Sequence, residues 1–175
     1  MDLAQALTNL VNGLVQPVWH FIMALAGFLG VFYLLRIMWK VVQANTLPGR
    51  PAVSGGEVAI AIVIAAVFVN YGVALQHVSG SLGLGAVSYS AIDYPAAQQF
   101  GQLAPAVNAV FTLASLGGGF YALKGLMMIN RAATGAGHAG EDLGWKGLTH
   151  VLAGTALINL VHLIGLLRQS TGGLW

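Results

Sequence analysis

The sequence predicts an all-α membrane protein with four transmembrane helices, which form two tandem helical hairpins behind a short amphipathic helix. The chain is 57% apolar and only 7% charged, whereas soluble domains carry roughly 25% charged residues. Its charge-free apolar stretches are close to the ~20 residues that a helix needs to cross the ~30 Å of bilayer hydrocarbon. The same short patterns also recur in both halves of the chain, which predicts an internal repeat.

Residues 1–17 predict a short amphipathic helix with apolar side chains along one face. The recurring leucines are Leu3, Leu7, Leu10 and Leu14. The segment is too short and too polar to span a bilayer, so it either lies in the head-group plane or extends the next helix. Pro17 is expected in the first turn of that next helix. No Lys or Arg precedes Arg36, so the segment lacks the basic start of a secretory signal, and we expect it to be retained.

The first hairpin is predicted at residues 18–82. Its first span covers residues 18–35, which contain no charged side chain. A loop rich in Gly, Pro and Ser follows at residues 45–56, a composition typical of turns. The second span covers residues 58–78 and contains few polar side chains, among them Asn70.

The second hairpin is predicted at residues 103–175, after a connector at residues 83–102. The start of the connector is rich in Gly and Ser, which favours a flexible or turned segment. The two spans of this hairpin cover residues 103–123 and 148–167, and both lack Asp, Glu, Lys and Arg. Pro105 is expected in the first turn of the earlier span, where its missing N–H has no cost.

Sequence matches between the hairpins predict a tandem duplication. Residues 32–36, FYLLR, match residues 120–124, FYALK, at an offset of 88 (120 − 32). An asparagine near the far end of each second helix, Asn70 or Asn159, matches at an offset of 89 (159 − 70). Two hairpins repeated in the same direction would have both of their loops on one side of the membrane.

Basic residues predict the orientation. Six of the seven Lys and Arg residues lie in the two hairpin loops and their flanks, and only Arg168 lies at the opposite side. Cytoplasmic loops carry an excess of Lys and Arg, so we expect a multi-pass protein of the bacterial inner membrane with both termini and the connector in the periplasm. The loop cations are also expected to contact phospholipid head groups. These six residues are Arg36, Lys40, Arg50, Lys124, Arg131 and Lys146.

Small residues and asparagines within the spans are candidates for helix packing. Three consecutive glycines at residues 117–119 would cost roughly 3 kcal/mol relative to alanine in a soluble helix, whereas small side chains let membrane helices approach closely. Gly30 matches Gly118 at the offset of 88 (118 − 30). Asparagine amides hydrogen-bond across helices at ~0.6–2 kcal/mol each. The predicted packing residues are Gly30, Asn70, Gly117, Gly118, Gly119 and Asn159.

Candidate catalytic chemistry is sparse. The chain has no Cys, which excludes disulfides, thiolate metal sites and cysteine nucleophiles. No Asp or Glu lies inside a predicted span, which argues against a proton-coupled pump. His150 and His162 are twelve residues apart (162 − 150), about 18 Å along a helix, which is too far for one metal ion. We therefore expect no enzyme activity, cofactor, metal, direct nucleic-acid partner or small-molecule substrate.

Two segments of the second hairpin resemble a known group of proteins. These segments are residues 118–126, GGFYALKGL, and residues 154–159, GTALIN. They resemble the small membrane proteins of type IVB secretion and conjugation systems, IcmC/DotE and IcmD/DotP, and their conjugal transfer relatives TraQ and TraR. The resemblance implies a structural component of a secretion or mating apparatus without enzyme activity. The plan of helix, basic loop and helix is also similar to that of VirB-type conjugative pilins, which assemble into filaments with lipid.

The predicted function is that of a non-catalytic integral membrane subunit of a type IVB-like conjugative transfer or secretion apparatus. In one version the chain is the pilus subunit and leaves the bilayer for an extracellular filament. Its partners would be membrane lipid, further copies of itself and other subunits, with phospholipid as the one expected ligand. The alternative is a small transporter or pore-forming protein with a path lined by Asn70, Asn159 and His162. A holin-like pore former is a third hypothesis.

Overall fold

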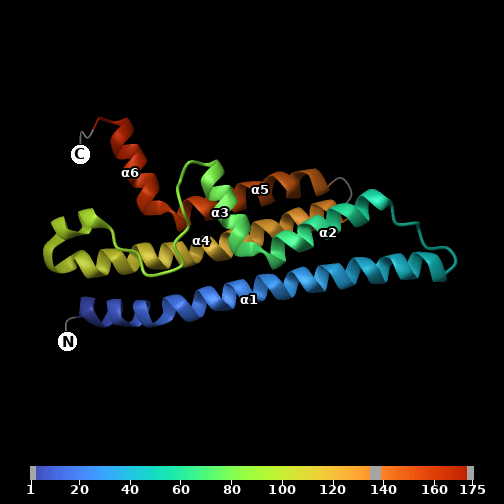
Figure 1. Cartoon of the computed structure of the whole chain (residues 1–175), viewed down its shortest axis with the longest axis horizontal. Coiled ribbons are helices and arrows are strands. Elements are labelled where there is room, and N and C mark those ends of the chain that lie inside the picture. The colour runs from blue at the N-terminus through green and yellow to red at the C-terminus, as the bar shows by residue number, and fades with distance from the viewer. Residues whose placement is uncertain (1–2, 135–138, 173–175) are drawn as a thin grey trace.

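A computed structural model describes residues 3–134 and 139–172 of the chain, with side chains described for residues 5–134 and 142–172 (Figure 1). All regular structure in these residues is helical, which confirms the predicted all-α class. The helices are α1 (Leu3–Thr46), α2 (Gly55–Val69), α3 (Tyr71–Ser81), the 3-10 helix η1 (Pro95–Leu103), α4 (Ala104–Ala133), α5 (Ala139–Ile158) and α6 (Leu160–Ser170).

Two helical segments of the described chain are long and apolar enough to cross a membrane. One covers Gln5–Thr46 and the other covers Pro95–Ala133. The helices α2 and α3 form a pair bent by 93°, and α5 and α6 form a pair bent by 84°. The number of candidate spans is therefore two, and it rises to four, the predicted number, only if each bent pair is one span.

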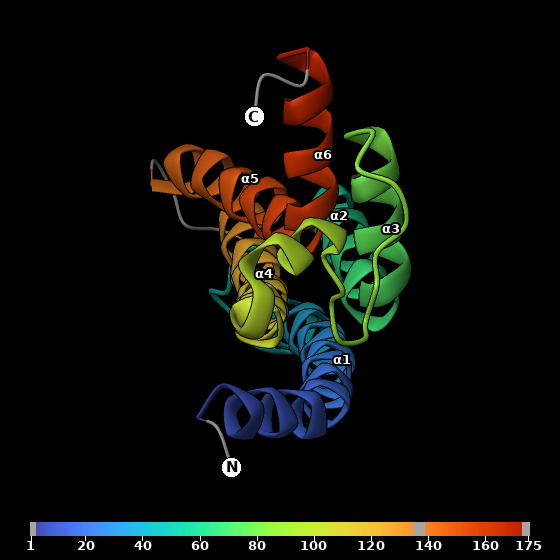
Figure 2. The same ribbon diagram turned by 90° about the vertical axis from the view of Figure 1, so that its left-hand side faces the viewer.

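The N-terminal segment is part of one long helix rather than a separate one. Helix α1 is continuous over 44 residues, or about 66 Å. Pro17 lies inside it, so the prediction that Pro17 opens a new helix was wrong. Apolar side chains that are buried on both sides of Pro17 explain the continuity, since Val11 and Val15 are as deeply buried as Trp19. The missing N–H and the ring of an internal proline bend a helix, and Figure 2 shows the first turns of α1 running across the direction of the rest.

Helices α1 and α4 run parallel to each other along the molecule, and each has a shorter antiparallel partner (Figure 1). Helix α2 packs on α1, and α5 packs on α4. After their bends, α3 and α6 leave the bundle on the side away from α1, as both views show. The buried centre of the molecule is a hydrophobic core with side chains from α1, α2, α3, α4 and α5. Its members include Trp19, Ile22, Phe68, Tyr71 and Leu123.

The two hairpins use the same close contact at Gly30 and Gly118. A Cβ atom on Gly30 would lie 2.8 Å from the carbonyl oxygen of Ala65, and one on Gly118 would lie 2.6 Å from that of Gly154. The first helices of the two contacts match at an offset of 88 (118 − 30) and the second helices at 89 (154 − 65). The two close contacts therefore lie at positions that differ by the same offsets as the sequence matches.

Gly119 lies at a third contact, where a Cβ atom would be 2.7 Å from the indole ring of Trp19. Two predicted packing residues lie elsewhere. A Cβ atom on Gly117 would have no neighbouring atom within 4 Å, because successive residues of a helix point about 100° apart and only two of the three glycines can face a partner. Asn70 is exposed, and its amide bonds to its own helix.

Candidate functional site

The bend between α2 and α3 is centred on Asn70. This residue leaves helical geometry with φ −101° and ψ 37°. Its backbone N–H and its side-chain Nδ2 both donate to the carbonyl oxygen of Ala66, each at 3.0 Å. Asparagine competes with the helix for backbone partners in this way, so the local sequence favours a break at this position.

Asn159 forms the same bend between α5 and α6. Its φ is −103° and its ψ is 29°, and its backbone N–H and Nδ2 both donate to the carbonyl oxygen of Thr155, at 3.2 and 3.1 Å. Unlike Asn70 it is buried, and its Nδ2 also donates to Ser79 Oγ of α3 at 3.0 Å. Of the two asparagines expected to bond across helices, Asn159 therefore does so and Asn70 does not.

Helix α3 is fixed to the bundle by hydroxyl groups that the sequence reasoning missed. Tyr71 Oη donates to the carbonyl oxygen of Gly119 at 2.5 Å. Tyr89 Oη, from the connector, donates to the carbonyl oxygen of Gly72 at 2.9 Å. Burial raises the pKa of Tyr89 to about 12, so its hydroxyl keeps the donated proton at neutral pH. The only sequence signal for Tyr71 is that it follows the break-forming asparagine directly.

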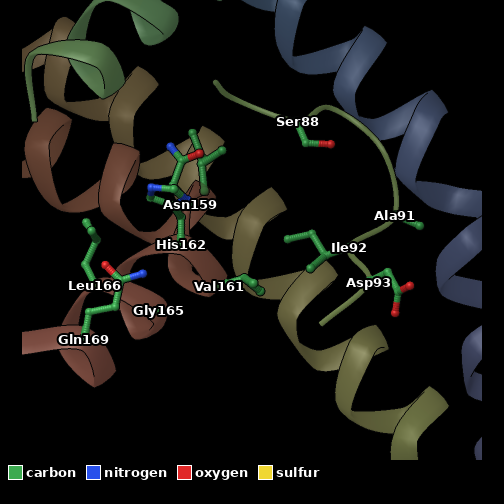
Figure 3. Close-up of a pocket in the computed structure, with 11 residues that line it drawn as sticks. Ser88, Ala91, Ile92, Asp93, Asn159, Val161, His162, Gly165, Leu166 and Gln169 are labelled. Carbon is green, nitrogen blue, oxygen red and sulfur yellow. The ribbon is translucent and has the colours of Figure 1, made fainter. Parts of the chain in front are cut away.

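A cavity of about 380 Å³ lies between the connector and the bend at Asn159. Figure 3 shows Asn159 and His162 at the helix bend, with Ile92 and Asp93 across the cavity on the connector. The carboxylate of Asp93 accepts a hydrogen bond from Asn108 Nδ2 at 3.0 Å. The lining mixes apolar side chains with amide, imidazole and carboxylate groups, which suits water or a small polar solute.

The histidines of the described chain are dispersed. His162 lines the cavity, whereas the ring of His150 stacks on that of Tyr121 with centroids 4.6 Å apart. Among the described residues, no three His, Cys, Asp or Glu side chains are grouped so that they could hold a metal ion.

The loop cations lie near the ends of the helices that the two predicted loops join. They belong to the second half of α1, the loop between α1 and α2, the last third of α4 and the first half of α5. Their side chains are exposed, and they are Arg36, Lys40, Arg50, Lys124, Arg131 and Lys146. Lys40 Nζ forms an ion pair with Glu57 at the start of α2. Lys124 Nζ lies over the ring of Tyr121, 5.6 Å from its centroid.

The cations nevertheless fall into two levels along the bundle. Ile22 packs on Gly119, and Tyr33 lines a cavity together with Asn130, so neighbouring positions on α1 and α4 differ by 97 (119 − 22 and 130 − 33). The sequence matches between the two halves instead differ by 88. The difference between the two offsets is nine residues (97 − 88), which corresponds to about 14 Å of helix rise. Lys124 is therefore about 14 Å along the bundle axis from the level of Arg36, the residue that it matches in the sequence comparison of the two halves.

Comparisons of the chain with protein-family models, with curated proteins and with solved structures each found no match.

Proposed function

We propose that the chain is a non-catalytic structural subunit of a multi-subunit apparatus in a bacterial inner membrane, of the type IVB conjugation or secretion class. The observation that carries this proposal is the pair of sharp bends at Asn70 and Asn159. Each bend sends a short helix sideways out of an apolar bundle, as Figure 2 shows.

The depth of the bend at Asn70 follows from the basic residues. If Arg36 marks the cytoplasmic boundary of the hydrocarbon, Gly30 lies six residues (36 − 30) inside it. Gly30 contacts the last turn of α2, at Ala65 and Val69. The bend at Asn70 is then about 10–15 Å deep, which is well inside a hydrocarbon layer ~30 Å thick.

Irregular backbone at this depth requires surrounding protein or a water-filled cavity, because lipid cannot satisfy free N–H and C=O groups. Neither α3 nor α6 has a side chain that caps its N-terminus. Both helices lie on the outside of the bundle. Neighbouring subunits, either copies of this chain or other proteins, would provide the missing cover.

The length of α1 is a second reason to expect neighbours. At about 66 Å it is roughly twice as long as the hydrocarbon layer is thick. Its first turns therefore lie outside the hydrocarbon layer on the proposed periplasmic side. Exposed leucines cover these turns, namely Leu7, Leu10 and Leu14 at 37%, 60% and 46% exposure. In water such a row needs a protein partner or the membrane surface.

The class of the apparatus rests on the resemblance of residues 118–126 and 154–159 to the small membrane proteins of type IVB systems. The pilus-subunit version rests on the hairpin plan and on the basic loops. Membrane lipid, copies of the chain and other subunits of the machine are the proposed partners, and the termini are proposed to be periplasmic.

A transporter or pore is the second candidate function, and the polar cavity favours it. Transporters often bind solutes where corresponding helices of two repeats are broken. Here the bends at Asn70 and Asn159 occupy corresponding positions, and Asn159 and His162 line a cavity of about 380 Å³. Asn70 is not among the residues that line this cavity, so assembly explains more of the geometry.

Cross-linking tests the proposed assembly. The natural chain has no Cys, so any thiol cross-link formed by the chain comes from the single cysteine that is introduced. Val73 on α3 is 56% exposed and Val63 on α2 is 62% exposed. We expect V73C to cross-link to a neighbouring subunit in native membranes and V63C to do so several-fold less.

Equal, low cross-linking of both variants, together with migration of the wild-type protein as a monomer on native gels, would overturn the proposal. Solute flux into vesicles reconstituted with the chain alone would instead support the transporter.

The proposed topology predicts labelling from one side only. Arg50→Cys and Arg131→Cys lie in or beside the two basic loops. In sealed cells neither cysteine should react with a membrane-impermeant maleimide, and in inverted vesicles both should react. Reaction of the two cysteines from opposite sides would exclude two hairpins that share a cytoplasmic end.

A further inference from the structure

A small second cavity lies where α1, α2 and α4 meet near the basic end of the bundle. Its volume is about 80 Å³, enough for roughly three waters or one compact polar group. Its polar lining consists of Tyr33, Arg36, Lys40, Glu57, Asn130 and Thr134. The function proposed above uses Arg36 only as a depth marker and does not use this cavity.

Asn130 is the unusual member of the lining. It is 2% exposed, and its Oδ1 has no hydrogen-bond partner among the described residues. Its backbone carbonyl oxygen is already occupied, since the N–H and Oγ1 of Thr134 donate to it at 3.0 and 2.8 Å. Leaving a buried acceptor without a donor costs about 1–3 kcal/mol. The side chain therefore points to a ligand that supplies an N–H or O–H group.

The charges of the lining point to an anion. Lys40 is paired with Glu57, and this is the one salt bridge formed between described side chains. Arg36 is left without an acidic partner among them, so the lining carries a net charge of +1 (Arg36 and Lys40 against Glu57). A guanidinium presents donors that match the oxygens of a phosphate group.

We propose that this cavity binds the head group of an anionic glycerophospholipid. The phosphodiester accepts hydrogen bonds from Arg36, and a hydroxyl of a glycerol head group donates to Asn130 Oδ1. The ligand would join three helices that otherwise meet around an unsatisfied amide. Arg36 is also the residue that marks the expected boundary of the hydrocarbon, where lipid head groups lie. The inference rests on the membrane placement used for the proposed function, but not on membership of any machine.

Lipid retention measured by native mass spectrometry of the purified full-length protein tests the site. The probes are phosphatidylglycerol and phosphatidylcholine, which carry the same phosphodiester, although choline has no N–H or O–H donor. We expect phosphatidylglycerol to be retained roughly tenfold better. A tenfold preference corresponds to about 1.4 kcal/mol, and a buried acceptor left without a donor, as Asn130 Oδ1 would be beside choline, costs about 1–3 kcal/mol.

Two variants that each remove one positive charge distinguish lipid binding in the cavity from a general attraction of anionic lipid to basic residues. Arg36→Gln should lose the preference for phosphatidylglycerol. Arg131→Gln should keep it, because Arg131 follows Asn130 in α4 but does not line the cavity. Asn130→Leu should also lose the preference. Since Asn130→Leu changes a buried residue, its helix content and melting temperature are measured alongside. If Asn130→Leu misfolds, Arg36→Gln alone decides the result.

Three results would each overturn the inference. They are equal retention of the two lipids by the wild type, an equal loss of the preference in Arg36→Gln and Arg131→Gln, and stabilisation by inorganic phosphate in lipid-free detergent that equals stabilisation by phosphatidylglycerol. The last result would assign the cavity to a free anion. The cross-linking of V73C is scored separately, so a monomer that retains phosphatidylglycerol would end only the assembly proposal.

Discussion

Replacing Gly118 with leucine is expected to separate α5 from α4. A Cβ atom at this position would lie 2.6 Å from the carbonyl oxygen of Gly154 and 2.9 Å from the backbone N of Ile158. Both are backbone atoms, so no side chain can move aside. Overpacking in a core typically costs about 1–3 kcal/mol, and we expect at least ~3 kcal/mol here because one helix must shift as a whole. Thermal unfolding in detergent, followed by circular dichroism, measures the loss.

The adjacent residue provides the matched control. Gly117 has no neighbour within 4 Å of a Cβ position, and it lies in the same helix directly before Gly118. Gly117→Leu should therefore leave the melting temperature unchanged or raise it slightly, because leucine has a higher helix propensity than glycine by up to ~1 kcal/mol. Equal melting temperatures for the two leucine variants would contradict the close contact of α4 with α5.

These glycines illustrate how far the sequence can predict packing. The run at residues 117–119 and its match with Gly30 predict that helices approach closely there, and Gly30, Gly118 and Gly119 do lie against neighbouring backbone or rings. The rotation of the helix about its axis is set by its partners. With three identical residues in a row, the sequence contains no information about which one faces outward.

The bends are the main feature that the sequence patterns did not predict. Residues 58–78 and 148–167 are predominantly apolar and contain no Asp, Glu, Lys or Arg. The length and hydropathy of such a stretch do not report a change in the direction of the helix. An asparagine in such a stretch has two options, a bond to a neighbouring helix or a bond to its own backbone. Asn159 uses both and Asn70 uses only the second. The bond of Asn159 to a neighbouring helix depends on Ser79, which lies 80 residues away in the chain.

At the end of the bundle that carries the basic residues, the sequence likewise predicts some features and not others. Charge counting identifies Arg36 and Lys40 as residues near a membrane boundary. It does not identify Asn130, which is an ordinary polar residue near a helix end until α1 and α2 cover it. The level difference of about 14 Å between Arg36 and Lys124 is likewise set by how α1 packs on α4, which no local pattern encodes.

Replacing Trp19 with alanine is the second change for which we expect a large effect. The indole is 1% exposed and belongs to the buried centre. It fills the space left by Gly119 and meets the ring of Tyr89 edge-on, with centroids 4.9 Å apart. Truncation of a buried tryptophan typically costs about 3–5 kcal/mol. The variant should melt far below the wild type and lose the fixed docking of the connector, which protease digestion of the folded protein detects.

Trp39 is the matched control on the same helix, because its side chain is 65% exposed. Trp39→Ala should change the melting temperature little, whereas it removes the same chemical group. Trp19→Phe separates packing from polarity, since the buried Nε1 of Trp19 has no hydrogen-bond partner among the described residues. Phenylalanine keeps most of the ring and removes the orphan donor, so we expect it to lose less than half of what alanine loses. If alanine at position 19 is tolerated as well as alanine at position 39, then α1 does not pack on α4 through this ring, and the register of the two long helices must differ.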